Sequence, residues 1–501
     1  MPSKTTARTK AGQRAATPPA ADTLVACWED DPGDPRSQPP LVPITVMVPN
    51  QSAQPLPFKV SGPRPVGNIY QPGTSGFLYY AAACALRRTA DFWGRIVPQG
   101  TKWEVGKFLP VQVDSGVDLN AFYTRGGGGE PPGLHFFHEA VTGRVYFSGE
   151  SPDVACHEMG HGVLDAIRPQ LFDAQTIEAA AFHESFGDMS ALLSVLQVQS
   201  FGQALLNETG GTINHASRLS RLAEQLGAAI RVQHPDAVDR DCLRNACNSF
   251  FYRDPQTLPP SAPASQLSSE PHSFSRVFTG AFLDALAGIF RVQGKTPSPE
   301  GLVKASQELG QILVGGVLGA PVVPDYYSQV AAHMVQIADG APFGRKYRDI
   351  LKSCFVRRGI LSLQAAATLS SVKRRIVGSS VRLERAGSEG RKLPTASISA
   401  AQYGLNRAAL KVYTAGEPKR FAVTSSSLTL GPVEPRSPQN AAESYTEDLF
   451  QRGHVDVGAH AHRVAGLTHP FSFKTHMIVE ENGELLLKRT TFDCGFDHKG
   501  N

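Results

Sequence analysis

Residues 157–161 read His-Glu-Met-Gly-His, and this spacing limits what the chain can fold into more than any other feature. On an α-helix, residues four apart lie on the same face, so the side chains of His157 and His161 can reach one metal ion. Glu158 lies about 100° round the helix from His157, where its carboxylate can touch a water on that metal without ligating the metal itself. The pattern predicts a helix that carries part of a hydrolytic zinc site.

The residues around this pentapeptide are typical of a helix. Ser151 suits the N-cap, Pro152 suits the first helical position, and Asp153 adds negative charge to the first turn. Pro169 ends the segment. Gly160 is the exception, because a glycine in mid-helix costs ~1 kcal/mol relative to alanine. We therefore expect another element to pack closely against that turn.

A second helix is predicted over residues 176–196, where Glu184 and Asp188 are again four apart. Structural zinc sites are closed by four protein ligands, whereas hydrolytic sites use three and keep one position for water. Glu184 is the predicted third ligand, and Asp188 is predicted to accept a hydrogen bond from a ligand histidine. Taken without the upstream helix, the two carboxylates would better fit the solvated face of an amphipathic helix.

These two helices resemble the zinc-binding helices of the thermolysin-like neutral metallopeptidases, which are gluzincins. Residues 153–165 resemble the metal-binding helix of that family, and residues 184–188 resemble its third-ligand motif. Upstream, residues 120–123 resemble the edge strand on which the family lays its peptide substrate. Downstream, residues 243–255 resemble a loop with a substrate-binding arginine, and residues 272–275 resemble the catalytic-histidine motif.

The resemblance spans residues 120–363 and implies a zinc-dependent metalloendopeptidase. A zinc-bound water would attack the peptide carbonyl while Glu158 takes its proton, and His272 would donate a hydrogen bond to the oxyanion. Cleavage is expected on the N-terminal side of bulky apolar residues. The implied zinc ligands are His157, His161 and Glu184, the implied catalytic residues are Glu158 and His272, and the implied substrate contacts are Asn120, Ala121 and Arg244.

Two other functions stay open at this point. An exopeptidase of the same zinc class would show a charged group that anchors one terminus of the substrate. A catalytically silent binding protein of the same fold would have lost a ligand or the base. The chain keeps both histidines, Glu158 and Glu184, which argues against the silent binding protein.

The sequence also departs from the family pattern. The acidic clusters that hold calcium in secreted relatives are not evident after Asp188, and Asp153 is the remaining carboxylate of that kind, so the sequence does not support a calcium ion. The carboxylate that orients the catalytic histidine is not in its usual place. Glu270 is the nearest candidate for that task.

Charge and composition limit the kinds of partner and the location that can be expected for this protein. The net charge of +4 is small for 501 residues and argues against a nucleic-acid-binding protein. A peptide or protein substrate is what the resemblance implies. The seven cysteines form no even framework, and free thiols are expected. No stretch approaches the ~20 apolar residues of a membrane span. Because no secretory signal is visible, we expect a cytoplasmic protein or export by a non-standard route.

The pattern of elements predicts an α+β protein with a thermolysin-like core of two lobes and a small β-rich accessory domain whose partner is unknown. Strands are expected at residues 44–48, 111–113 and 145–148, and helices at 215–230, 272–290, 299–317, 326–337 and 347–361. Later strands are expected at 421–430 and at 475–492, around an Asn482-Gly483 turn. The predicted organisation is a disordered basic tail (1–40), a β-rich lobe (41–150), a helical zinc-binding lobe (151–369), a linker (370–394) and the accessory domain (395–501).

Overall fold

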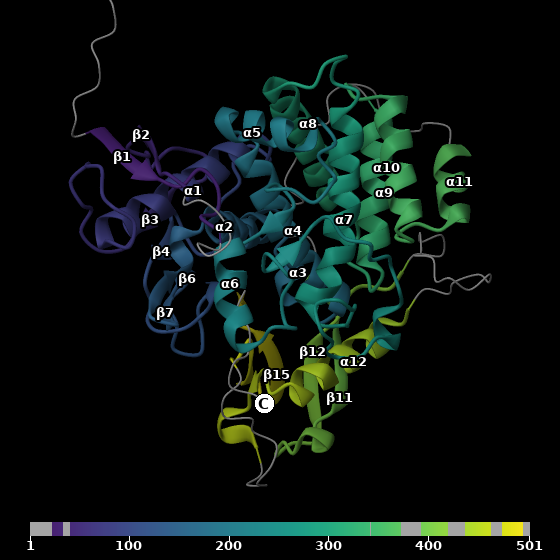
Figure 1. Ribbon diagram of the computed structural model, residues 1–501. Helices are drawn as coiled ribbons and strands as arrows, with labels where there is room; N and C mark the ends of the chain where they lie inside the picture. The colour runs from purple at the N-terminus through teal and green to yellow at the C-terminus, as the bar shows by residue number, and fades with distance from the viewer. Residues whose placement is uncertain are drawn as a thin grey trace, which may run out of the picture.

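The computed structural model describes residues 23–33, 41–340, 342–371, 392–418, 436–461 and 473–493. These residues form a mixed structure of helices and strands (Figure 1). In the view of Figure 1, the first strands lie on the left and the long helices on the right. The strands and the helix of the C-terminal part lie below both.

The first sheet borders the helix that carries His157 and His161, and it has five strands in the order β16-β5-β6-β4-β3. β5 pairs antiparallel with β16 and β6, whereas β6 and β4 pair parallel, as do β4 and β3. Two short pairs, β1 with β2 and β7 with β8, lie outside this sheet. The strands are β1 Leu24–Cys27, β2 Ile44–Met47, β3 Phe58–Val60, β4 Leu109–Gln112, β5 Ala121–Thr124, β6 Gly133–Phe136, β7 His138–Val141, β8 Arg144–Phe147 and β16 Thr491–Asp493.

The three strands predicted before residue 150 are present as β2, β4 and β8. The same region also contains helix α1, Ser75–Gly94, which the prediction of a β-rich segment did not include. Thr74 caps this helix by accepting a hydrogen bond from the Phe77 N–H at 3.3 Å. The helix was missed because its alanines and aromatic residues are buried on most sides, so it lacks the polar face that marks an amphipathic helix.

The helix with the two histidines is α2, Pro152–Ile167, and the second predicted helix is α4, Ile177–Val195. Ser151 accepts a hydrogen bond from the Val154 N–H at 3.3 Å, so the predicted N-cap is confirmed. Every residue of both helices is buried. They approach closely at Gly160, where an added Cβ would lie 2.6 Å from Ser190 Oγ and 3.0 Å from Gly187 Cα. The close packing expected at this turn is therefore present.

The chain after α4 is mainly helical as far as residue 371. The predicted helix at 215–230 begins only at Glu224, because Arg221 and Leu222 form strand β9, which pairs with β10, Arg244–Asn245. The other four predicted helices are present with shifted ends. The helices besides α1, α2 and α4 are α3 Gln170–Asp173, α5 Gln199–Thr209, α6 Glu224–Gln233, α7 Pro271–Phe290, α8 Pro299–Gly319, α9 Tyr326–Asp339, α10 Arg345–Arg357 and α11 Leu363–Ser371.

Helix α7 is the one described helix that is by itself long and apolar enough to cross a membrane. Of its most apolar stretch, 83% is buried inside the protein, as in a core helix. Helices α4 and α5 pass the same test only if they are counted together, and they meet at a bend of 99°.

The C-terminal part forms a second sheet of five strands in the order β11-β12-β15-β14-β13. Asn482 and Gly483 both have positive φ and join β14 to β15, which confirms the predicted two-residue turn. Helix α12, Pro438–Gln451, lies in a region predicted to be β-rich, and the strand predicted at 421–430 falls outside the described residues. The strands are β11 Thr395–Ser399, β12 Ala409–Tyr413, β13 Val455–Asp456, β14 His476–Glu481 and β15 Glu484–Arg489.

A segment near the N-terminus holds the first turn of α2. Asp31 contacts the Ser151 hydroxyl and accepts a hydrogen bond from the Gln225 N–H at 2.8 Å. Asp153 accepts one from the Ala223 N–H at 2.9 Å. The carboxylates thus connect β1, α2 and α6 at the positive end of the α2 dipole.

This burial makes stability depend on pH. Burial and then the charge of Asp31 raise the pKa of Asp153 from 3.8 to about 8, with Glu224 adding to the rise and Arg88 opposing it. The folded chain therefore binds the Asp153 proton more tightly than the unfolded chain does. The stability that this proton contributes is complete below the unfolded pKa and is lost as pH rises towards the folded pKa.

We expect Asp153→Asn to raise the melting temperature at pH 8 and to change it little near pH 4, because the amide stays neutral and can still accept the Ala223 hydrogen bond. Thermal melts across this range measure the effect, with the exposed Asp456→Asn as control. A gain from Asp153→Asn that is the same at every pH would contradict the expectation.

The contact at Gly160 gives a second prediction. Gly160→Ala should destabilise the protein by ~1–3 kcal/mol, the usual cost of overpacking, despite the better helix propensity of alanine. Gly162→Ala is the matched control on the same helix, because its added Cβ meets its nearest neighbour at 3.4 Å. Thermal melts should show a lower melting temperature for Gly160→Ala and an unchanged or higher one for Gly162→Ala.

Candidate metal centre and active site

The three predicted ligands face one another between α2 and α4. The Nε2 atoms of His157 and His161 lie 3.1 Å apart. Glu184 places Oε2 3.3 Å from His157 Nε2 and Oε1 3.8 Å from His161 Nε2. All three side chains are almost completely buried. Helical spacing brings the two histidines together, and the packing of α4 on α2 adds the carboxylate.

The donor set fits a zinc ion. At the usual zinc–nitrogen bond length of ~2.0 Å, two donors of a tetrahedral site lie about 3.3 Å apart, which is close to the separations found here. Two imidazole nitrogens that turn their lone pairs towards each other repel unless a cation or a proton lies between them. One carboxylate beside them supplies negative charge that a divalent ion would balance.

Two carboxylates are near the histidines, and they differ in position. Glu158 is fully buried, and one of its oxygens lies within 4.8 Å of a ring nitrogen of His157 and of His161. Glu184 lies 3.3 Å from His157 Nε2 through Oε2 and 3.8 Å from His161 Nε2 through Oε1. Both carboxylates therefore lie within reach of an ion held by the two imidazoles.

The other ring nitrogen of His157 is held by Asp188, whose Oδ1 is 3.1 Å from His157 Nδ1. This contact orients the ring so that Nε2 faces the other ligands. Arg244 donates from Nη2 to the same Asp188 oxygen at 2.9 Å, and Thr279 donates to the second oxygen at 3.4 Å. Burial would raise the pKa of Asp188, but Arg244 and His157 together lower it to about 2. Asp188 therefore stays an acceptor over the physiological range.

His183 contacts His161 in the same way that Asp188 contacts His157. No pattern in the sequence predicted this contact. Its Nδ1 lies 3.3 Å from His161 Nδ1. Burial and then the neighbouring His161 lower the pKa of His183 well below its usual value, so the ring is neutral. A neutral His183 can accept the Nδ1 proton of His161, which leaves His161 Nε2 free to face the metal.

His272 lies at the first turn of α7 on the other side of Glu184, with Nε2 3.1 Å from Glu184 Oε2. Glu270 caps α7 by accepting from the backbone N–H groups of His272 and Ser273 at 3.0 and 2.7 Å. Its Oε1 also lies 2.7 Å from His272 Nδ1. The nearest carboxylate in sequence is thus the one that orients His272. Burial raises the pKa of Glu270, but His272 outweighs this and lowers it to about 2.

The predicted substrate-binding segment lies beside the ligands but not at the edge of its sheet. Asn120 is buried, and its Oδ1 accepts from the Ala121 N–H at 2.8 Å. Tyr123 on β5 donates to Asp165 of α2 at 2.6 Å, which fixes the strand to the histidine helix. The expectation of an edge strand is wrong, because β16 pairs with the outer side of β5. Sequence spacing cannot reveal a strand that arrives from a point more than 360 residues later.

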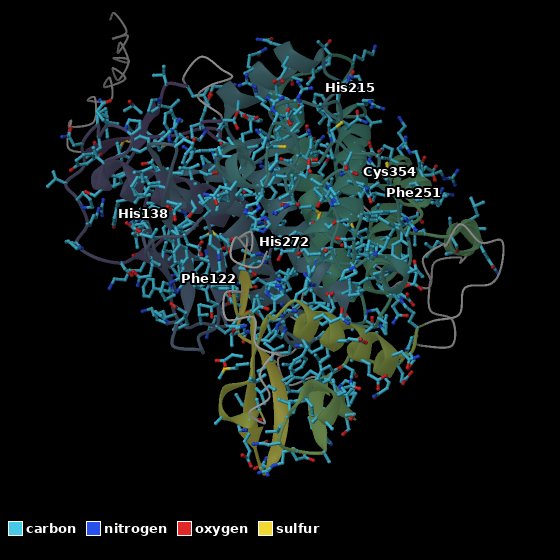
Figure 2. All side chains as sticks on the ribbon, turned by 60° about the horizontal axis from the view of Figure 1, so that its bottom comes forward. Phe122, His138, His215, Phe251, His272 and Cys354 are labelled. Atoms are coloured by element: carbon cyan, nitrogen blue, oxygen red, sulfur yellow. The ribbon has the colours of Figure 1, made fainter. Side chains whose placement is uncertain are left out.

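A cavity of about 850 Å³ opens next to the ligands. Glu184, Arg244 and His272 line one side of it, and residues of the C-terminal part line the other. Figure 2 shows His272 and Phe122 near the place where the yellow C-terminal strands reach the rest of the protein. The cavity residues from the C-terminal part are Tyr445, Leu449, Gln451, Arg452, His454, Thr475, Arg489, Phe492 and Asp493.

Among the described residues, the one group of three or more metal-binding side chains that lie close enough to share an ion contains His157, Glu158 and His161. The carboxylates near Asp153 do not form such a group. Six of the seven cysteines lie in the described chain, and all six are free thiols, as expected.

The sequence was compared with protein-family models and with curated proteins, and it matches none of either.

The third ligand can be tested directly. Glu184→Ala should abolish stoichiometric zinc binding, because two imidazoles alone leave the site short of a ligand and of its negative charge. Zinc content after dialysis, measured by elemental analysis, is the readout. The matched control is Glu447→Ala, which removes an exposed helical glutamate and should leave zinc unchanged. Equal zinc in Glu184→Ala and the native protein would refute the assignment.

Proposed function

We propose that this protein is a zinc-dependent metalloendopeptidase with a thermolysin-like catalytic core. In this proposal, residues 41–150 and 151–369 form the two lobes of the core, and residues 395–501 form an accessory domain. The observation that carries the proposal is the set of facing donors on His157, His161 and Glu184, with a second buried carboxylate on Glu158 beside them.

Zinc, when bound, would supply a Lewis acid that lowers the pKa of water and polarises a peptide carbonyl. The residues of the chain would do the rest. Glu158 would take the proton of the attacking water and pass it to the leaving amine, since its buried carboxylate lies next to both histidines. Asp188 and His183 would keep the ligand histidines in the right tautomer through their Nδ1 atoms.

His272 would donate from Nε2 to the oxygen that gains negative charge as water attacks. Its Nδ1 is already held by Glu270, so the ring needs little reorganisation during the reaction. Loss of one such donor in other enzymes costs ~2.7–4 kcal/mol of transition-state stabilisation. Arg244, fixed by Asp188 at the cavity wall, would bind a second carbonyl of the substrate.

The test of the proposal is Glu158→Gln. The variant should keep one zinc per chain and lose peptide hydrolysis, because an amide cannot accept the proton of water. Zinc content and cleavage of an unbiased peptide pool are measured on the same preparation, with Glu447→Gln as control. Hydrolysis by Glu158→Gln at the native rate would overturn the mechanism.

Mass spectrometry of the digested pool separates the endopeptidase from an exopeptidase. We expect internal cleavages on the N-terminal side of bulky apolar residues, with no need for a free amino terminus. Products released one residue at a time from an end would replace the endopeptidase with an exopeptidase.

A further inference from the structure

The chain places one of its own strands against the candidate active site. β16 pairs antiparallel with β5, with Thr491 opposite Thr124, Phe492 opposite Tyr123 and Asp493 opposite Phe122. It takes the outer position of the sheet next to the metal ligands. Without it, β5 would expose a row of unpaired backbone N–H and C=O groups, which is the kind of edge that extended peptides join.

The last residue of this strand, Asp493, contacts the predicted catalytic residue His272. The backbone carbonyl oxygen of Asp493 lies 2.7 Å from His272 Nε2. The same nitrogen is 3.1 Å from the Glu184 carboxylate. A peptide carbonyl from the chain itself therefore occupies the position in which His272 would meet the carbonyl of a substrate.

The side chain of the preceding residue, Phe492, packs against the rings of His161 and His183. The Phe492 ring is 2% exposed and stacks on His183 with ring centres 4.0 Å apart and on His161 at 5.1 Å. Its edge meets Phe172 at 5.4 Å. Two of these rings belong to a predicted zinc ligand and to the residue that orients it. The pocket is thus built for a flat aromatic group.

The strand is short and is joined directly to the second sheet. It has three residues and follows β15 directly through Thr490. Thr491 donates to the Tyr123 carbonyl at 3.0 Å, and Thr124 donates to the Thr490 carbonyl at 2.7 Å. The Arg489 guanidinium lies 4.2 Å from the centre of the Phe492 ring. Main-chain pairing and one aromatic anchor are also what a bound peptide would use.

We infer that residues 491–493 are an intramolecular ligand that blocks the peptide-binding edge of the candidate site, so that the full chain is self-inhibited. The inference rests on the proposed function, because it takes the β5 edge and His272 as the place where a peptide binds. It also assigns the pocket of His161, His183 and Phe172 to an aromatic side chain of the ligand.

Covalent connection makes this competition effective. A tethered strand meets its site at an effective concentration in the millimolar range, which a free peptide rarely reaches. Phe492 and Asp493 line the cavity of about 850 Å³. The strand therefore covers one part of the candidate site, and the cavity leaves space beside it. Release of a three-residue strand would open the edge without unfolding the sheet of β12, β14 and β15.

The experiment compares two shortened chains. One ends at Thr490 and lacks β16, and its matched control ends at Gly495 and keeps β16. Phe492→Ala in the full chain is a second way to weaken the strand. The probe is a fluorescein-labelled, C-terminally amidated peptide Arg-Thr-Thr-Phe-Asp, the sequence of residues 489–493, with a version in which alanine replaces phenylalanine. Every chain also carries Glu158→Gln for binding, so that the probe is not cleaved.

The chain that ends at Thr490 should bind the probe at least ~10-fold more tightly than the control, because a strand seated in nine of ten molecules leaves ~10% of them able to bind. Phe492→Ala should lie between the two. The alanine probe should bind more weakly than the phenylalanine probe. Fluorescence anisotropy gives these affinities, and zinc content and melting temperature show that each chain is folded.

Equal affinity of the folded Thr490 chain and the control would overturn the inference. If the Thr490 chain does not fold, equal affinity of Phe492→Ala and the native chain overturns it instead. Hydrolysis by the same chains with Glu158 intact separates the two proposals. Tighter binding without hydrolysis by any zinc-loaded chain supports the strand as ligand and refutes the peptidase. Equal hydrolysis and equal binding support the peptidase and refute self-inhibition.

Discussion

The contact between α2 and α4 is the constraint on which the candidate site depends. Gly160 lets the two helices approach until Ser190 and Gly187 touch it, and a Cβ at Gly187 would lie 2.5 Å from the His157 ring. Glycine at both positions therefore brings the Glu184 carboxylate within reach of two imidazoles on the neighbouring helix. The loss of helix propensity at two buried glycines is offset by a close interface between two helices that are buried on all sides.

Each histidine of the site is oriented through its second nitrogen by a different partner. Asp188 holds His157, His183 holds His161, and Glu270 holds His272. The three partners differ in charge. The pKa values of Asp188 and Glu270 are lowered to about 2, so both are anions, whereas the pKa of His183 falls well below its usual value, so its ring is neutral. Two fixed anions and one neutral ring therefore set the proton positions around the donors before any ligand arrives.

Two contacts join the C-terminal part to elements that carry the candidate site. Arg436 pairs with Glu178 of α4 and with Asp325 in a buried network, which joins the segment before α12 to the helix that carries Glu184. After β15 in the second sheet, the chain continues into β16, which forms the outer strand of the first sheet. The C-terminal part thus contacts α4 at Glu178 and the candidate site at His272. A movement of this part would act on the site through β16, since that strand is its most direct contact with His272.

Local patterns in the sequence determined the elements and residues that depend on short-range physics. Helical spacing predicted the histidine helix and the shared face of Glu184 and Asp188. Residue types predicted the N-cap at Ser151, the close contact at Gly160 and the turn at Asn482-Gly483. A buried helix such as α1 has no polar face to reveal it. The roles of His183 and Phe492 were decided by tertiary structure alone, because stacking and strand pairing join residues that are far apart in the chain and leave no periodic signal.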